Sequence, residues 1–210
     1  MTAPTTTTTR IDPAILYWGT PVVLVSTLNE DGTANVAPFS SVFWLGHTAT
    51  LGLGLASHTL ANLRRTGECV LNLPGPEQVT AVDRLALTTG APTPNGWKRA
   101  NGYRHVRDKF RHAGLTPAGS DLVAAPRVAE CPVAMEAQLR VVHVTDHALV
   151  QAEVVAVHVD AALRMPGRPN RVDPDAWRPL IMSFQQFYGL ADGRLHHSKL
   201  GEIPEALYRP

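Results

Sequence analysis

Apolar and polar positions in the first half of the chain alternate in short runs that are typical of β-strands. Pro21–Thr27 (PVVLVST) is apolar and β-branched, as in a buried strand, and Asn29–Gly32 follows it as a turn. Ala34–Leu45 resumes as an extended run broken at Pro38, which requires a sheet edge or a bulge because proline cannot donate to a ladder. In Thr48–Leu55, leucine alternates with small residues, and its glycines indicate a close approach to the backbone.

Helical spacing begins after these strands. Ser57–Thr59 offers good N-cap residues for a short helix over Leu60–Thr66, and Gly67 is placed as its C-cap. Glu68–Leu73 again has the pattern of a strand. A second helix is predicted from Pro76 to about Leu87, with proline at its start and apolar residues at helical intervals.

The second half combines a long irregular segment with further strands. Thr88–Ala125 is rich in Gly, Pro and Asn, and a loop of that length inside a domain is usually functional. Met135–Val144 and Ala148–Val159 predict a long hairpin, and Leu180–Phe184 a last strand. Six or seven antiparallel strands with a few short helices favour a small barrel, since closing the sheet removes its edges.

Composition narrows the class of protein. The 210 residues are 44% hydrophobic and 18% charged, and a formal net charge of +1 gives no reason to expect nucleic-acid or membrane binding. Cys69 and Cys131 are too few for a disulfide scaffold or a thiolate zinc site, so we expect buried thiols. No apolar run approaches the roughly 20 residues of a membrane helix. We expect a disordered tail over residues 1–11, a single domain over residues 12–210, and a cytoplasmic location.

Several segments have residues suited to ligand binding. Asn35–Ser41 clusters small and hydroxylated side chains around a proline, which suits the edge of a flat ring but also suits a plain bulge. Ser57–Thr59 opens a helix, where unpaired N–H groups favour a phosphate, or simply form a cap. The basic stretch Trp97–His112 would close over a phosphate, dock an acidic partner or remain a solvated loop. Tyr188 would lie near a ring system or in the core, and His196-His197 lacks partners for a metal site, so we expect no metal.

In this order and spacing, the segments resemble the flavin reductase-like family of FMN-binding split barrels, which includes flavoredoxins and the reductase components of two-component monooxygenases. The resemblance extends over about residues 12–190. It rests on Asp31–Ser40 (DGTANVAPFS), Thr59–Leu73 (TLANLRRTGECVLNL), Asp108–Phe110, Ala113–Thr116 and Glu130–Glu136. It implies a mainly β fold, a six- to seven-stranded antiparallel split β-barrel of Greek-key type with a few short helices.

The resemblance also implies a cofactor and its contacts. FMN, or FAD as the alternative, would be the cofactor, and NADH or NADPH the electron donor. The ring would lie against Asn35, Ala37, Pro38, Phe39 and Ser40, and the phosphate against Ser57, His58, Thr59 and Asn62, with Lys109, Phe110 and Tyr188 near the flavin. Many relatives have a basic residue followed by Asp just before the helix threonine, whereas this chain has Ala56-Ser57-His58. The phosphate would therefore be held by Arg64, by the basic loop, or more weakly.

The function that follows is an NAD(P)H:flavin oxidoreductase. Electrons would pass to free flavin, to oxygen or to a partner monooxygenase, with no catalytic side chain, and the resemblance implies a homodimer. Gln185–Tyr188 replaces a stretch that many reductases share, and this difference is the reason for the first of three alternatives that stay open. These are direct action on a small-molecule substrate, a non-catalytic electron-transfer module, and a barrel that binds heme or a deazaflavin.

Overall fold

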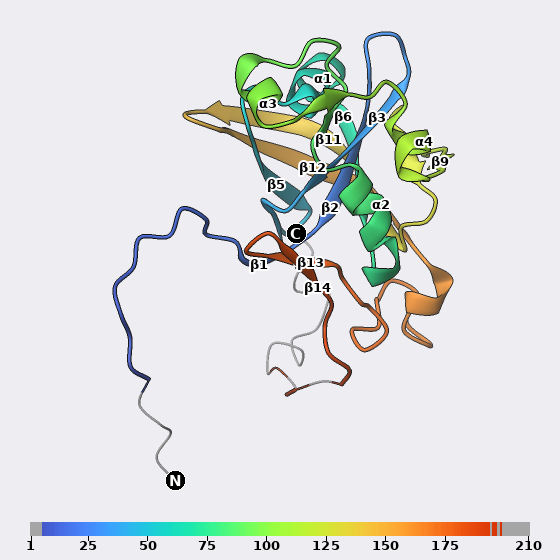
Figure 1. Cartoon of the computed structure of the whole chain (residues 1–210). Coiled ribbons are helices and arrows are strands. Elements are labelled where there is room, and N and C mark those ends of the chain that lie inside the picture. The colour runs from blue at the N-terminus through green and yellow to red at the C-terminus, as the bar shows by residue number, and fades with distance from the viewer. Residues whose placement is uncertain (1–5, 194, 197, 199–210) are drawn as a thin grey trace.

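The computed structural model describes residues 6–193, 195, 196 and 198. Its main feature is a curled antiparallel sheet of seven strands in the order β3-β2-β6-β11-β12-β5-β4 (Figure 1). These strands are β2 (Val23–Leu28), β3 (Ala34–Phe39), β4 (Val42–Leu45), β5 (Thr48–Leu53), β6 (Glu68–Leu73), β11 (Val133–Val144) and β12 (Ala148–Val159). The predicted fold class, a mainly β split barrel, is confirmed.

The barrel is split between β3 and β4, which form the two edges of the sheet although they are consecutive in the chain. Ser40 and Ser41 cross the split, and the Ser41 carbonyl accepts a 2.8 Å hydrogen bond from the Gly52 N–H on β5. The predicted break at Pro38 is wrong in its position, because Pro38 lies within β3 opposite Leu24 and the chain breaks only after Phe39. The edge position that proline requires is confirmed.

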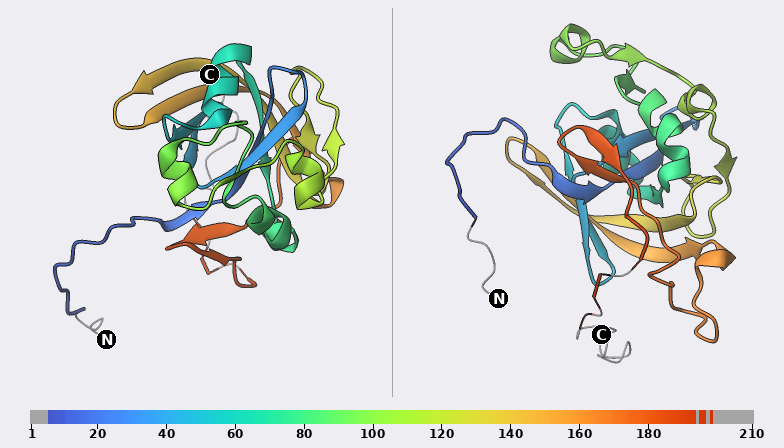
Figure 2. Two further views of the ribbon diagram at one scale, coloured as in Figure 1. Left: turned by 45° about the horizontal axis from the view of Figure 1, so that its top comes forward. Right: turned by 60° about the horizontal axis from the view of Figure 1, so that its bottom comes forward.

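Two apolar cores lie on opposite faces of β2. Val23 and Val25 face the barrel interior, while Leu24 faces a second core closed by α2 (Val79–Arg84) and α4 (Lys109–Ala113). Burial on both faces explains why β2 reads as a continuous apolar run rather than an alternating one. The hairpin of β11 and β12, each 12 residues long, projects beyond the rest of the sheet (Figure 2).

Smaller elements surround the barrel. They are β1 (Trp18–Pro21), α1 (His58–Thr66), η1 (Pro76–Gln78), β7 (Thr88–Thr89), α3 (Gly96–Ala100), β8 (Arg104–His105), β9 (Pro117–Ala118), β10 (Arg127–Val128), η2 (Ala161–Leu163), β13 (Ile181–Ser183) and β14 (Gln186–Tyr188). Strands β1, β13 and β14 form a separate small sheet at one end of the barrel (Figure 1). Both cysteines are free and buried, as expected.

Two sequence predictions need correction. The helix predicted over Pro76–Leu87 is divided into η1 and α2 and ends at Arg84. The region Thr88–Ala125 is not wholly irregular, since it contains α3, α4 and three short strands. Each of these helices is only five residues long and depends on a single side-chain cap, Asn95 or Asp108, so no apolar periodicity reveals it.

The described part of the N-terminal segment lies apart from the barrel. Residues 6–12 are exposed and have no helix or strand, and Figure 1 shows this segment leading away from the barrel. Residues 1–5 of the predicted tail, and His197 of the histidine pair, lie outside the described residues. Among the described helices, none has the length and hydropathy needed to cross a membrane.

A buried carboxylate anchors one loop to the sheet. Glu136 on β11 is fully buried and accepts hydrogen bonds from the N–H groups of Asp121 (2.7 Å), Leu122 (2.6 Å) and Val123 (3.2 Å). The His158 ring lies 2.6 Å away from the same carboxylate. Burial alone would raise the pKa of Glu136, but the N–H groups and the histidine outweigh it and hold that pKa below its usual range.

We therefore expect Glu136→Gln to lower the free energy of unfolding by about 1–3 kcal/mol at neutral pH, because an amide N–H₂ would face backbone donors. Urea denaturation measures this. Since the pKa of Glu136 is lower in the folded state, its contribution is present at neutral pH and is lost as the pH falls through that lowered value. Glu153→Gln, which removes an exposed partner of Arg140, is the control. Equal stability of the two variants would contradict the prediction.

Candidate functional site

A cavity of about 990 Å³ opens at the split of the barrel. Its wall is formed by β3, the end of β5, the start of α1, residues 85–90 and α3, and the β11–β12 hairpin adds Thr145, His147 and Leu149. This volume is at the upper end of the range for small-molecule sites. The size and the mixed polar and apolar wall suit a ligand with a large ring and a polar tail.

The start of α1 supplies hydrogen-bond donors to this cavity. Ser57 is the N-cap, and its side chain accepts from the Leu60 N–H at 3.4 Å. His58 and Thr59 begin the helix and line the cavity with Ser57. The first-turn N–H groups of a helix have no intrahelical partner and carry partial positive charge, so this end of the nine-residue helix favours an anion.

A polar network supports the helix start from behind. The Asn62 side-chain N–H₂ donates to Thr27 Oγ1 (3.0 Å) and to Asn29 Oδ1 (3.1 Å), and His58 Nε2 lies 2.8 Å from the same Asn29 oxygen. Asn35 Nδ2 donates to Thr27 Oγ1 at 3.2 Å and to Thr59 Oγ1 at 3.4 Å. These bonds tie α1 to β2 and β3, and they set the positions of His58 and Thr59.

Two buried polar groups on the cavity wall lack partners within the described residues. Asn35 Oδ1 is buried and accepts no hydrogen bond. Lys109, at the start of α4, is only 1% exposed, and burial and the charge of Lys98 act on its pKa without any described acidic partner. A buried polar group without a partner costs free energy, so an acceptor and a cation are both available to a ligand here.

The charge of the cavity has one sign. Lys98 and Lys109 line it together with His58, and no Asp or Glu is among its described lining residues. Burial, assisted by the charge of Lys98, lowers the pKa of Lys109 to about 7. Burial and then the neighbouring Lys109 and Lys98 lower the pKa of His58, so this histidine is neutral at pH 7. The cavity therefore favours an anionic ligand.

The structure places most of the predicted site residues on the cavity wall. The residues found there are Asn35, Ala37, Pro38, Phe39, Ser40, Ser57, His58, Thr59 and Lys109. Asn62 lies behind the wall in the polar network, and Phe110 is buried in the second core beside Val36. Tyr188 is an exposed residue of β14, paired with Ile181, and does not line the cavity.

Other wall residues were not singled out from the sequence. Lys98, Trp97 and Tyr103 come from the basic segment, where their grouping was noted but no single residue was chosen. Of the cations in that segment, Lys98 and Lys109 alone line the cavity, and Arg107 instead pairs with Asp31. Gly90 also lies on the wall, and only a conserved glycine in an alignment would have revealed it.

Comparison with known proteins gives consistent results. Residues 16–191 match the profile of the family described as the flavin reductase like domain. A Bacillus subtilis (strain 168) protein, the uncharacterized protein YdfE, is 36% identical over 185 residues, which cover 86% of this chain and 88% of that protein.

Solved structures share the fold at lower identity. Flavoredoxin of Desulfovibrio vulgaris (Miyazaki F) superposes with a TM-score of 0.75 at 23% identity, covering 93% of this chain and 100% of that chain. Nitrilotriacetate monooxygenase component B from Bacillus cereus superposes with a TM-score of 0.70 at 20% identity, covering 90% and 99%. At these identities the two structures support the fold of the chain.

Gly90 offers a test of how tightly this wall is packed. A Cβ atom at Gly90 would lie 2.5 Å from His58 Cδ2 and 2.7 Å from Asn35 Oδ1. We expect Gly90→Ala to lower the free energy of unfolding by about 1–3 kcal/mol, because the histidine ring must move. Thermal unfolding measures the effect. Gly54→Ala is the matched control, since it lines the same cavity and its Cβ would meet nothing within 4 Å. A G90A protein as stable as G54A would contradict the packing described.

Proposed function

The chain belongs to the flavin reductase-like family, and from this premise we propose that it binds FMN and acts as an NAD(P)H-dependent flavin oxidoreductase. One observation carries the proposal. The cavity at the split contains Lys98 and Lys109 without an acidic residue among its described lining residues, and it contains the unpaired acceptor Asn35 Oδ1. A flat heterocycle with amide-like edges and a phosphate tail satisfies all of these groups.

The donor set fits the two ends of FMN. Ala37, Pro38 and Phe39 form a mostly apolar wall along β3, which is an edge strand and has backbone N–H and C=O groups that no neighbouring strand uses. Such a wall suits the isoalloxazine ring and its pyrimidine edge. The helix start at Ser57 suits the phosphate, because N–H donors and partial positive charge meet there. Riboflavin lacks that phosphate, so we propose a preference for FMN.

Bound FMN would supply the redox chemistry, taking a hydride from NAD(P)H and passing electrons to an acceptor. The residues of the chain have simpler tasks. β3 orients the ring, and the surrounding wall excludes water from one side of it. Lys109, which is buried at this wall, carries in its protonated form a positive charge that would stabilise additional negative charge on the ligand. No side-chain nucleophile or acid–base pair is required.

The acceptor and the assembly are also proposals. A structural neighbour named as a monooxygenase component supports a partner monooxygenase as acceptor, with free flavin and oxygen as alternatives. The edge strand β4 exposes Phe43 and Leu45, the latter 79% exposed, and an apolar edge of this kind is normally covered. This supports a homodimer. The buried free thiols of Cys69 and Cys131 are consistent with the reducing cytoplasm.

A spectrum and an anaerobic titration test the proposed function. We expect the purified protein to be yellow, or to become so with FMN, and NADH or NADPH to bleach the flavin under nitrogen. FAD and riboflavin serve as comparison ligands. A colourless protein that takes up no flavin would refute the proposal. A yellow protein that neither nicotinamide bleaches would instead favour a flavin-binding electron-transfer module.

Lys109 allows a pH-dependent test of the same site. Only the protonated amine attracts an anion, and the pKa of Lys109 in the free protein is about 7. Lys98 is the charged group that acts on it, and Lys109 in turn acts on His58. A bound anion raises that pKa, so the contribution of Lys109 to FMN affinity is complete below about pH 7 and falls as the pH rises from the free towards the bound value.

We expect Lys109→Met to weaken FMN binding about tenfold or more at pH 7 and to flatten its dependence between pH 7 and 9. The variant should also be at least as stable as the parent without ligand, because an unpaired buried amine is replaced by an apolar side chain. Fluorescence quenching and thermal unfolding measure these effects. Arg111→Met removes an exposed charge from the same helix and should change neither. Equal affinities of K109M and R111M would refute the role of Lys109.

A further inference from the structure

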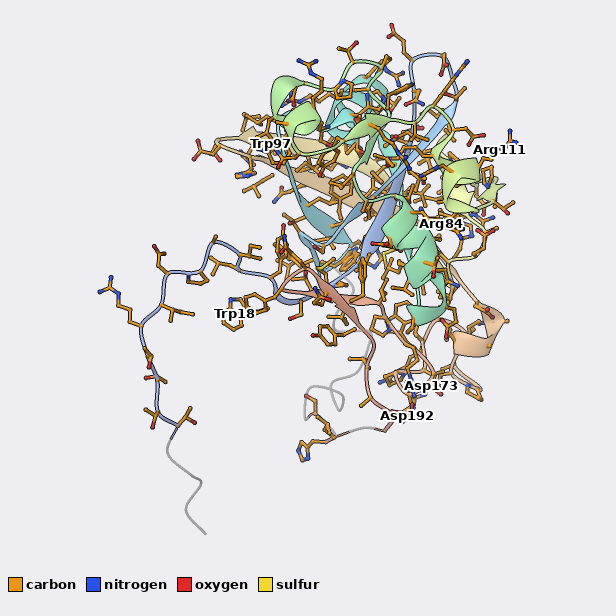
Figure 3. The ribbon with its side chains drawn as sticks, viewed as in Figure 1. Trp18, Arg84, Trp97, Arg111, Asp173 and Asp192 are labelled. Atoms are coloured by element: carbon orange, nitrogen blue, oxygen red, sulfur yellow. The ribbon has the colours of Figure 1, made fainter. Side chains whose placement is uncertain are left out.

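Helix α3 lies at the rim of the cavity and is weakly attached to the barrel. None of its five residues is buried, and Asn95 caps it by accepting from the Lys98 N–H at 2.8 Å. Trp97 on α3 is 66% exposed (Figure 3), and residues of α3 and of the β11–β12 hairpin both line the cavity. A short helix without buried residues gains little from packing, so its position depends on a few specific contacts.

The Lys98 side chain links α3 to the start of α1. Its ammonium group donates to the Ala56 carbonyl at 2.9 Å and reaches Thr89 Oγ1 at 3.5 Å. Ala56 immediately precedes Ser57, the N-cap of α1. The Tyr103 ring lies 5.8 Å from the same ammonium group and steadies it from the loop side. A positive charge is thus held next to the free N–H groups of a helix, by a segment some 40 residues further along the chain.

A second, independent feature indicates that an anion belongs at this place. Lys109 lines the same cavity and is 1% exposed, and burial followed by the charge of Lys98 lowers its pKa. Two cations brought together without an acidic residue on the described wall repel one another. An anion between them and the helix start removes this repulsion and gives the unpartnered Lys109 an acceptor.

The other basic residues considered for this task lie elsewhere. Arg64 and Arg65 belong to the last turn of α1, on the order of 10 Å from its start. Arg65 also donates to the Leu28 carbonyl. Arg107 pairs with Asp31, outside the cavity wall. His58, which precedes Thr59 directly, has a lowered pKa and carries no charge at pH 7.

We propose that Lys98 is the cation of a phosphate site at the start of α1, and that α3 is a strap which Lys98 fastens over a phosphate monoester. This deepens the proposed function, because the monoester would be the FMN tail. Lys98 therefore determines the preference for FMN over riboflavin, whereas the β3 wall binds the ring of both flavins. This chain has no basic residue beside the helix threonine, so the strap brings the charge from a distant part of the sequence.

The test compares Lys98→Gln with Arg99→Gln. Arg99 is next to Lys98 on α3, donates to the Pro94 carbonyl and does not line the cavity, so R99Q removes an equal charge from the same strap. Dissociation constants for FMN and riboflavin are measured by fluorescence quenching of the apoprotein at low ionic strength. We expect K98Q to bind FMN at least tenfold more weakly and riboflavin within about threefold of the parent, and R99Q to match the parent for both.

A second readout uses inorganic phosphate alone. Phosphate should raise the melting temperature of the flavin-free parent and of R99Q but not of K98Q, and it should slow tryptic cleavage after Lys98 and Arg99 in the parent. If K98Q keeps the parental ratio of FMN to riboflavin affinity, or if R99Q loses as much, Lys98 is not the phosphate cation and the inference fails. If the parent binds neither flavin but the phosphate effects are found as described, the proposed function fails and the anion site stands.

Discussion

The rest of the site depends on the split between β3 and β4. A curled antiparallel sheet that does not close leaves two edges, and here the chain crosses between them in two residues, Ser40 and Ser41. Edge backbone groups without a neighbouring strand must be satisfied by solvent, a loop or a ligand. The loop around Gly90, the start of α1 and α3 gather around this opening, and the cavity is the space they leave. The open split of the barrel therefore leaves a cavity of the size that a ligand needs.

The same opening also explains why a lysine is buried beside another positive charge. In the solvent, lysines find counter-ions or water, but Lys109 on α4 is 1% exposed, and the charged neighbour that acts on it is Lys98, another cation. A fold retains such a group at a cost when a ligand offsets it, since anything that binds only the native state stabilises that state. The unpaired Asn35 Oδ1 fits the same reasoning from the acceptor side. Among the described residues, Lys109 and Asn35 Oδ1 thus both lie at the cavity as groups that a ligand would satisfy.

Sequence patterns predicted the barrel well because its strands obey simple periodicity. The apolar run of β2, the long hairpin of β11 and β12, and the Ser57 and Gly67 caps of α1 are all local signals. The β3 segment and the helix start, which both line the cavity, were singled out for the same reason. Where neighbouring residues differ in direction, the sequence does not separate them. Phe110 directly follows Lys109 on a helix, so the two side chains point about 100° apart, and one lines the cavity while the other packs in the core.

The long segment between β7 and α4 could not be placed from the sequence, because short capped helices have no periodicity. Two residues of the cavity wall, Gly90 and Lys98, lie in this segment. The charge on this segment also bears on the start of α1, where the expected basic residue is missing. The fixed positive charge expected just before Thr59 is missing, and burial, followed by the charges of Lys109 and Lys98, lowers the pKa of His58. A lysine or arginine just before Thr59 would add a third cation beside Lys98 and Lys109, which already repel one another. The site needs a limited positive charge. The residue before Thr59 is neutral, and the chain provides the charge from Lys98 on α3 instead.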